Sequence, residues 1–131
     1  MIFVFGSNEA GIHGAGAARF ARLNRGAMTG VGSGPQGESY AIPTKGMRAF
    51  NGRKFIGETL PLSRIKEYVD DFIAFAEAFP EKTFMVTQVG CGLAGLRPED
   101  VAPLFGKAPK NCLFDEAWKQ FLPDRQYWGT C

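Results

Sequence analysis

One long segment of the chain carries apolar residues at helical spacing. Between positions 62 and 79 they fall three or four residues apart or side by side, at Ile65, Val69, Phe72, Ile73 and Ala76. Proline stands on either side, at Pro61 and Pro80, where it favours the start of a helix or follows its end. The pattern predicts an amphipathic helix over Leu62–Phe79 whose apolar stripe packs on a core.

Short runs of apolar and β-forming residues predict buried strands. Four such runs are present, at Ile2–Phe5, Ser39–Ile42, Thr83–Val89 and Cys112–Phe114. The second is expected to stop at Pro43, because proline lacks the N–H group that a strand ladder needs.

Three further helices complete the pattern. They are expected at Ala15–Leu23, Pro98–Phe105 and Glu116–Phe121, the last capped by Asp115. Strands and helices therefore alternate along the chain, which is typical of a layered α/β domain. With 131 residues the chain is long enough for one core and too short for two, so residues 1–131 are interpreted as a single domain.

Composition narrows the class of protein. Hydrophobic residues make up 45% and charged residues 21%, as in ordinary globular proteins, which excludes a disordered chain. A net charge of +2 argues against attachment to nucleic acid by bulk electrostatics. No apolar run approaches the roughly 18 residues of a membrane span and no basic leader is present, so neither a membrane nor a signal peptide is expected. The three cysteines include no C-x-x-C pair, which favours a reducing, cytoplasmic setting.

Glycine is concentrated in loops that follow expected strands. Twelve of the seventeen glycines lie between Gly6 and Gly57, and three more fall within Val89–Leu96. Gly6–Ala18 (the first loop) and Val89–Leu96 (the second loop) each join a strand to a helix, so their backbone N–H groups can form a cradle for phosphate. Ligands of open α/β sheets bind beyond the carboxyl ends of the strands, which predicts one shared site. Either loop alone is also consistent with a tight turn that allows close helix–sheet packing.

The first loop matches neither of two common nucleotide-binding motifs. A Walker loop requires G-x-x-x-x-G-K-[ST], and no lysine follows these glycines. The dinucleotide fingerprint G-x-G-x-x-G begins at Gly14 and Gly16, but Arg19 occupies its third glycine position. The ligand must therefore be inferred from other residues.

Lys45 is the residue best placed for chemistry. It follows an expected strand, where its amine could pair with a phosphate or attack a sugar C1″ or an aldehyde, although most lysines are simply exposed. His13 is the single histidine, so no Ser–His–Asp triad can form, and it either contacts the ligand or fixes the turn. Cys91 is interpreted as a small buried filler rather than a nucleophile.

A basic stretch with interleaved aromatic residues follows Lys45. It contains Arg48, Phe50, Arg53, Lys54 and Phe55. Such a pattern can meet nucleic-acid phosphate, but a solvated loop is the favoured interpretation.

Three strings of residues resemble one branch of the macro-domain family. Gly11–Phe20 is similar to the glycine-rich substrate loop and following helix of macro domains, and Ile42–Lys45 is similar to the strand end that carries a catalytic lysine. Gly90–Leu96 resembles the loop that wraps the diphosphate of ADP-ribose in the branch formed by the terminal ADP-ribose protein glycohydrolase and the DNA ADP-ribosyl glycohydrolase antitoxins. Order and spacing agree over Ile2–Phe105, most of the chain.

The resemblance implies a three-layer α/β/α macro-like fold with a mixed, mostly parallel sheet. The sheet is expected to be trimmed at its N-terminal edge, because the sequence opens directly on the strand before the first loop. The implied activity is hydrolysis of ADP-ribose from a modified nucleic-acid base or protein side chain, with Lys45 as the catalytic residue and without a metal or other cofactor. Ligand contacts are implied for Asn8, Ile12, His13, Gly14, Ala15, Gly16, Thr44, Gly90, Cys91, Gly92, Leu93, Ala94 and Gly95.

Several points stay open at this stage. The implied partner is ADP-ribose or an ADP-ribosylated substrate; nucleic acid has weaker support, since Gly46-Met47-Arg48 keeps only the arginine of the antitoxins' His-Trp-Arg string. Asp115 or Glu116 is a candidate second catalytic acid, and Asp115 serves equally well as a helix cap. Two other interpretations are a module that binds ADP-ribose or a related nucleotide without chemistry, and a phage-derived interaction protein that no longer binds the ligand.

Overall fold

Helices and strands form an α/β fold around one seven-stranded sheet in the computed structural model, which describes residues 1–131. The strands are β1 (Ile2–Asn8), β2 (Gly34–Gln36), β3 (Ser39–Phe50), β4 (Arg53–Thr59), β5 (Phe84–Val86), β6 (Cys112–Asp115) and β7 (Tyr127–Gly129). The helices are α1 (Gly16–Asn24), α2 (Leu62–Ala78) and α3 (Pro98–Val101), with 3₁₀ helices η1 (Ala102–Phe105) and η2 (Glu116–Trp118).

The sheet is mixed and mostly parallel. Its spatial order is β2-β3-β1-β5-β6-β7, and β4 pairs with β3 outside this path. β3, β1, β5, β6 and β7 pair in parallel, whereas β2 and β4 run antiparallel to β3. The carboxyl ends of β1, β3 and β5 therefore meet on one side of the molecule, where the sequence predicts a ligand site.

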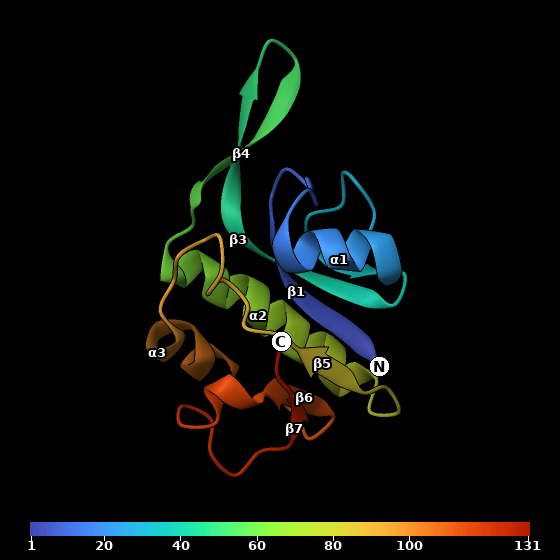
Figure 1. Cartoon of the computed structure of the whole chain (residues 1–131), viewed down its shortest axis with the longest axis vertical. Coiled ribbons are helices and arrows are strands. Elements are labelled where there is room, and N and C mark those ends of the chain that lie inside the picture. Colours follow the sequence, from blue (N-terminus) through green and yellow to red (C-terminus); the bar gives the residue numbers. More distant parts are fainter.

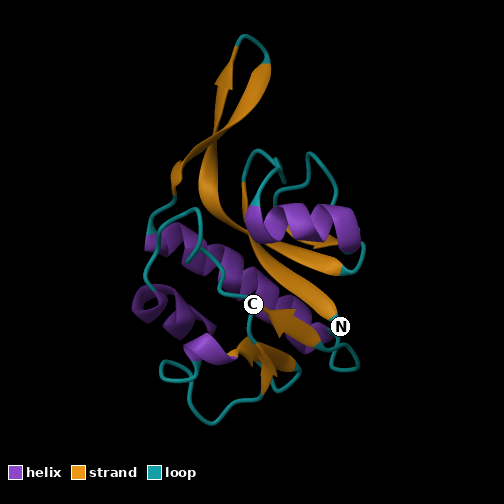
Figure 2. Cartoon of the chain, in the orientation of Figure 1, coloured by secondary structure: helices purple, strands orange, loops and turns teal.

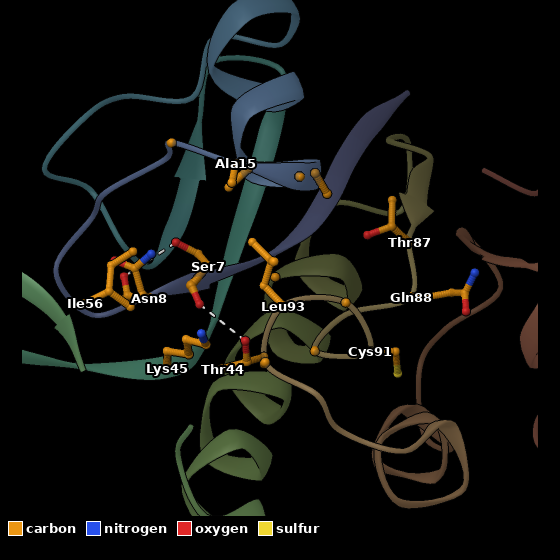
Figure 3. A pocket seen from close by; sticks show the side chains of 18 of the residues that line it. Ser7, Asn8, Ala15, Thr44, Lys45, Ile56, Thr87, Gln88, Cys91 and Leu93 are labelled. Carbon is orange, nitrogen blue, oxygen red and sulfur yellow. Dashed lines mark hydrogen bonds between the residues drawn. The ribbon is translucent and has the colours of Figure 1, made fainter. Parts of the chain in front are cut away.

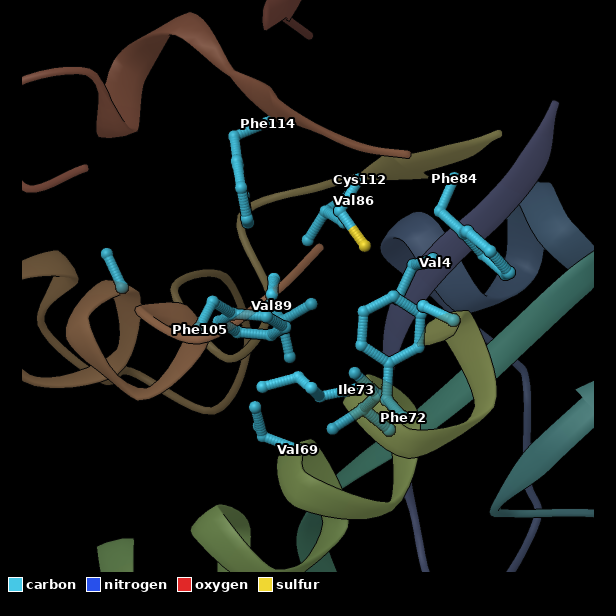
Figure 4. Packing of buried hydrophobic residues seen from close by; sticks show 14 of the residues in the cluster. Val4, Val69, Phe72, Ile73, Phe84, Val86, Val89, Phe105, Cys112 and Phe114 are labelled. Carbon is cyan, nitrogen blue, oxygen red and sulfur yellow. The ribbon is translucent and has the colours of Figure 1, made fainter. Parts of the chain in front are cut away.

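Helices cover both faces of the sheet (Figure 1). Along β1, Phe3 and Phe5 pack in the cluster that holds the buried alanines of α1, whereas Val4 belongs to the larger cluster beneath α2. α2 buries the five residues of the predicted stripe, and Figure 4 shows Phe72 and Ile73 facing the sheet. None of the helices is both long and apolar enough to cross a membrane.

The prediction that the second strand stops at Pro43 is wrong. β3 continues through Pro43 to Phe50. Proline is tolerated there because β2 pairs with β3 only as far as Ala41 and β4 begins its pairing at Lys45. Pro43 thus falls in a gap on that side of the strand, where its missing N–H group removes no ladder hydrogen bond.

Two other predicted elements are shorter than expected. The strand at Thr83–Val89 is confined to Phe84–Val86, because the chain turns directly after Thr87: the N–H of Val89 donates to the Thr87 carbonyl at 2.8 Å. The helix at Glu116–Phe121 is reduced to η2, and the N–H groups of Lys119 and Phe121 donate three residues back, as in a 3₁₀ helix.

The basic stretch after Lys45 is a hairpin and not the solvated loop that the sequence favours. β3 and β4 pair as far as Phe50 and Arg53, with Asn51 and Gly52 at the turn, both at positive φ. This hairpin projects from the body of the molecule (Figures 1 and 2). The sequence also gave no sign of β2 and β7, which are three residues long and lie at the edges of the sheet.

Candidate functional site

A cleft of about 490 Å³ opens at the carboxyl ends of β1 and β5, beside Thr44 and Lys45 in the middle of β3 (Figure 3). The first loop, the second loop and Lys45 line it together. The lining residues are Gly6, Ser7, Asn8, Ile12, Gly14, Ala15, Gly16, Ala17, Ala18, Thr44, Lys45, Ile56, Thr87, Gln88, Gly90, Cys91, Gly92, Leu93, Ala94 and Cys131. The two glycine-rich loops, which were predicted to share one site, therefore line a single cavity.

Backbone N–H groups without protein acceptors line the cleft from both loops. In the first loop, the N–H groups of Gly14 and Ala15 donate to no protein atom, and the first N–H groups of α1 have no acceptor within the helix. In the second loop the same is true of Gly92, Leu93 and Ala94. Two independent sets of free donors thus belong to residues that line one cavity, an arrangement that suits an anion with two charged groups.

Glycine keeps both loops open toward the cleft. A Cβ atom added at Gly14 or at Gly92 would meet no atom within 4 Å, so these positions border free space. Gly90 differs, because it has a φ of +78° and an added Cβ would lie 2.9 Å from Leu96. Gly90 is therefore required by the turn, whereas Gly14 and Gly92 leave room for a ligand.

Asn8 shapes the first loop from within. Its side-chain amide donates to the carbonyl of Ile12 at 2.8 Å, and its oxygen accepts from the N–H of Ile12 at 3.0 Å. The loop is also tied to β3, since the N–H of Glu9 donates to the Lys45 carbonyl at 2.9 Å. Asn8 lines the cleft, but both ends of its amide already hold the loop in place.

His13 and Gly95 do not line the cleft. The imidazole of His13 is 2% exposed, lies edge-on to the Phe5 ring and has Nε2 3.0 Å from the Val31 carbonyl. Of the two roles the sequence allows for His13, the structure shows the one that fixes the turn. The other expected contact residues, from Asn8 to Ala94, all border the cavity.

Lys45 lies at one end of the cleft. Figure 3 shows it near Thr44 and at the same end as Asn8 and Ile56, whereas Gln88 and Cys91 lie at the far end. The side chain of Lys45 is partly buried and takes part in none of the five ion pairs of the chain. Its amine is therefore free of a carboxylate partner and available to a ligand.

Neither candidate second acid lines the cleft. Asp115 is fully buried; its Oδ1 accepts from the N–H of Ala117 at 2.9 Å, which confirms the predicted cap. Its Oδ2 accepts from the side chain of Gln88 at 3.3 Å, and Gln88 does border the cavity. Asp115 therefore acts on the site by orienting Gln88, and Glu116 is exposed outside it.

Burial governs the chemistry of Cys91. The thiol is half-buried at the far end of the cleft, where loss of solvent raises its pKa. A raised pKa keeps the thiol protonated at neutral pH, which fits the interpretation that Cys91 is not a nucleophile. Nowhere in the chain do three or more His, Cys, Asp or Glu side chains gather as a metal ion would require.

Eight lining residues lie outside the expected contact set; four of them belong to the first loop, at Gly6, Ser7, Ala17 and Ala18, and the other four lie outside both loops. Thr87 and Gln88 directly follow β5 and could have been found from the rule that ligands bind beyond strand ends. Ile56 comes from the unforeseen β4, and Cys131 reaches the cleft because β7 pairs with β6. Comparisons with protein-family models, with curated proteins and with solved structures give no match for this chain.

Proposed function

We propose that this chain is a macro-like domain that binds ADP-ribose in the cleft and releases it from a modified base or side chain with the help of Lys45. The single observation that carries the proposal is the convergence of two sets of unpaired backbone donors and one unpaired lysine on a single cavity. The resemblance of the two loops and of Ile42–Lys45 to the ADP-ribosyl glycohydrolase branch agrees with this geometry.

The backbone donors favour a diphosphate. The second loop offers three successive N–H groups, from Gly92 to Ala94, and the first loop adds those at the start of α1. A pyrophosphate carries charged oxygens on two adjacent phosphorus atoms, so each loop can bind one of them without clashing with a side chain. A cavity of about 490 Å³ lies within the range of small-molecule sites, which is roughly 300–1,000 Å³.

The position of Lys45 at one end of the cleft fits a reaction at the distal sugar. In the proposed step, the neutral amine forms a bond to C1″, the bond from C1″ to the base or side chain breaks, and the amine's proton passes to that leaving group. Water then replaces the lysine at C1″, which restores the amine and yields free ADP-ribose. A positively charged Lys45 that only stabilises the departing group is the electrostatic form of the same proposal.

Binding without catalysis is the second candidate function. It is favoured by one observation: no carboxylate or imidazole lines the cleft, so Lys45 has no general acid or base beside it. In that case the positive charge of Lys45 contributes to ligand binding and not to bond cleavage.

Two substitutions of Lys45 separate these candidates. Calorimetry with ADP-ribose and a release assay with ADP-ribosylated DNA and protein are applied to the wild type, Lys45→Ala and Lys45→Arg. A nucleophilic lysine predicts loss of turnover in both variants with ADP-ribose affinity kept within several-fold, whereas turnover retained by Lys45→Arg indicates an electrostatic role. Lys107→Gln, which removes a cation remote from the cleft, is the control. Wild-type protein that gives neither binding heat nor a shift in melting temperature with ADP-ribose refutes the proposal.

A further inference from the structure

The β3–β4 hairpin beyond Lys45 extends from the molecule as a two-stranded ribbon, residues 46–57, called the arm below (Figures 1 and 2). Figure 2 shows no helix beside its outer half. The cross-strand pairs along it are Met47 with Ile56, Arg48 with Phe55, Ala49 with Lys54 and Phe50 with Arg53. An isolated pair of strands is marginally stable in water, so its exposed surface calls for an explanation.

The arm exposes large apolar side chains to solvent. Phe50 is 69% exposed, Phe55 and Met47 are each 43% exposed, and Ile56 is 41% exposed. Phe50 and Phe55 lie on one face of the ribbon and Met47 and Ile56 on the other, so each face carries a pair of exposed apolar side chains. Gathered apolar groups of this kind mark a surface that contacts a partner.

The arm also holds the excess positive charge of the chain. The sequence contains 15 basic and 13 acidic residues, and three of the basic residues but none of the acidic ones lie in the arm. The remainder of the chain is therefore slightly acidic. Arg48 forms an exposed ion pair with Glu58 at 2.8 Å, whereas Arg53 and Lys54 take part in no ion pair.

Strand pairing places both phenylalanines and two of the three basic residues on one face, and Lys54 on the other. Directly paired residues of an antiparallel ladder share a face, and so do residues two apart along a strand. One face of the arm therefore carries Arg48, Phe50, Arg53 and Phe55, and the guanidinium of Arg53 lies 5.9 Å from the centre of the Phe55 ring. Surfaces that bind single-stranded nucleic acid combine such rings, on which bases stack, with cations that hold the phosphates.

We propose that the arm binds single-stranded nucleic acid. A nucleic-acid strand has unpaired bases available for stacking on Phe50 and Phe55, and its phosphates are complementary to Arg53 on the same face and to Lys54, its neighbour on the other face of the ribbon. Ile56 lies on the other face of the arm and lines the cleft at the end where Lys45 lies (Figure 3), so a nucleic-acid strand that passes over the edge of the arm reaches the cleft. A strand on the arm can therefore deliver a modified nucleotide to Lys45; this delivery rests on the proposed function, whereas binding of the strand does not.

The test measures fluorescence anisotropy of labelled, unmodified 12-nucleotide DNA and RNA strands, and of a 12-base-pair duplex, with the full chain. Two double variants alter the arm, Phe50→Ser with Phe55→Ser and Arg53→Gln with Lys54→Gln. Lys107→Gln with Lys110→Gln removes the same charge from exposed positions outside both arm and cleft. All four substituted arm residues are exposed, so their replacement should leave the fold intact. Melting temperature and binding of free ADP-ribose are measured for every variant to check this.

The proposal expects the wild type to bind single strands more tightly than duplex, with an affinity that falls as salt rises. Each arm variant should lose at least ten-fold in affinity, and the lysine control should change less than three-fold. Three results would each overturn the proposal. The wild type could bind no single-stranded nucleic acid, the control and arm variants could lose affinity equally, or the wild type could form a dimer in solution that the phenylalanine variant disrupts. Unchanged ADP-ribose binding in the arm variants separates failure of the arm from failure of the cleft.

Discussion

Gly92 offers the most direct way to perturb the cleft without perturbing the fold. An added Cβ there meets no atom within 4 Å, and its φ lies outside the left-handed region, so valine fits the backbone. Replacement of glycine also reduces the freedom of the unfolded chain, so the free energy of unfolding should stay within about 1 kcal/mol of the wild type. Valine would instead occupy the space beside the free N–H groups of Gly92 and Leu93.

The expected effect of Gly92→Val on affinity follows from those two donors. Each hydrogen bond to a charged phosphate contributes about 1.5–3 kcal/mol, so loss of both amounts to about 3 kcal/mol or more. The dissociation constant for ADP-ribose, measured by calorimetry, should rise by roughly 100-fold or beyond. Gly90→Val is the contrast, since its positive φ and its contact with Leu96 predict a lower melting temperature. ADP-ribose affinity of Gly92→Val within two-fold of the wild type would refute a role for the second loop in the site.

Two further predictions concern buried polar groups. Asp115→Ala should lower the free energy of unfolding in urea by about 1–3 kcal/mol, because it removes the cap on Ala117 and leaves Gln88 unpartnered. Asp115→Asn keeps an acceptor for Ala117 and should retain ADP-ribose release; loss of release with unchanged melting temperature and ADP-ribose affinity would contradict a purely structural role for Asp115. Burial raises the pKa of Cys112 from 9.0 to about 12, and burial with the nearby Asp71 raises that of Tyr40 from 10.0 to about 12. The folded state therefore keeps protons that the unfolded state releases, so stability should fall as pH rises from about 9 to 12, at up to about 1.4 kcal/mol per pH unit for each group. In Cys112→Ala the decline between pH 9 and 12 should be shallower than in the wild type, and an unchanged slope or a flat stability curve would contradict the assignment.

Long-period patterns made much of the fold predictable. α2 follows the predicted range to within one residue because its apolar stripe and flanking prolines act together. β1 and α1 were likewise marked by an apolar run and a glycine-rich entry. The prediction for β3 is too short because proline usually ends a strand. Pro43 is tolerated because it falls between the segments of β3 that pair with β2 and with β4, which the sequence alone does not reveal.

The parts of the site that are formed by backbone groups could be predicted from the sequence. The two glycine-rich loops and Lys45 could be placed at one sheet edge because parallel strands share their carboxyl ends. The contact of His13 with Val31 and that of Asp115 with Gln88 could not be predicted, since each joins segments distant in the sequence. Ile56 was missed for the same reason, because it reaches the cleft through the pairing of β4 with β3.

The continuity of β3 has a mechanical consequence. One uninterrupted strand joins Lys45 to Phe50, and the returning strand is fastened beside it: the Thr59 hydroxyl donates to the Ala94 carbonyl at 2.9 Å, and the N–H of Leu60 to the Thr44 carbonyl at 2.8 Å. A force applied at the tip of the arm would thus act both on β3, which carries Lys45, and on the second loop, which contains Ala94. Binding of a partner at the arm and binding of a ligand in the cleft would therefore be mechanically coupled, because bending of the arm would move both walls of the cavity together.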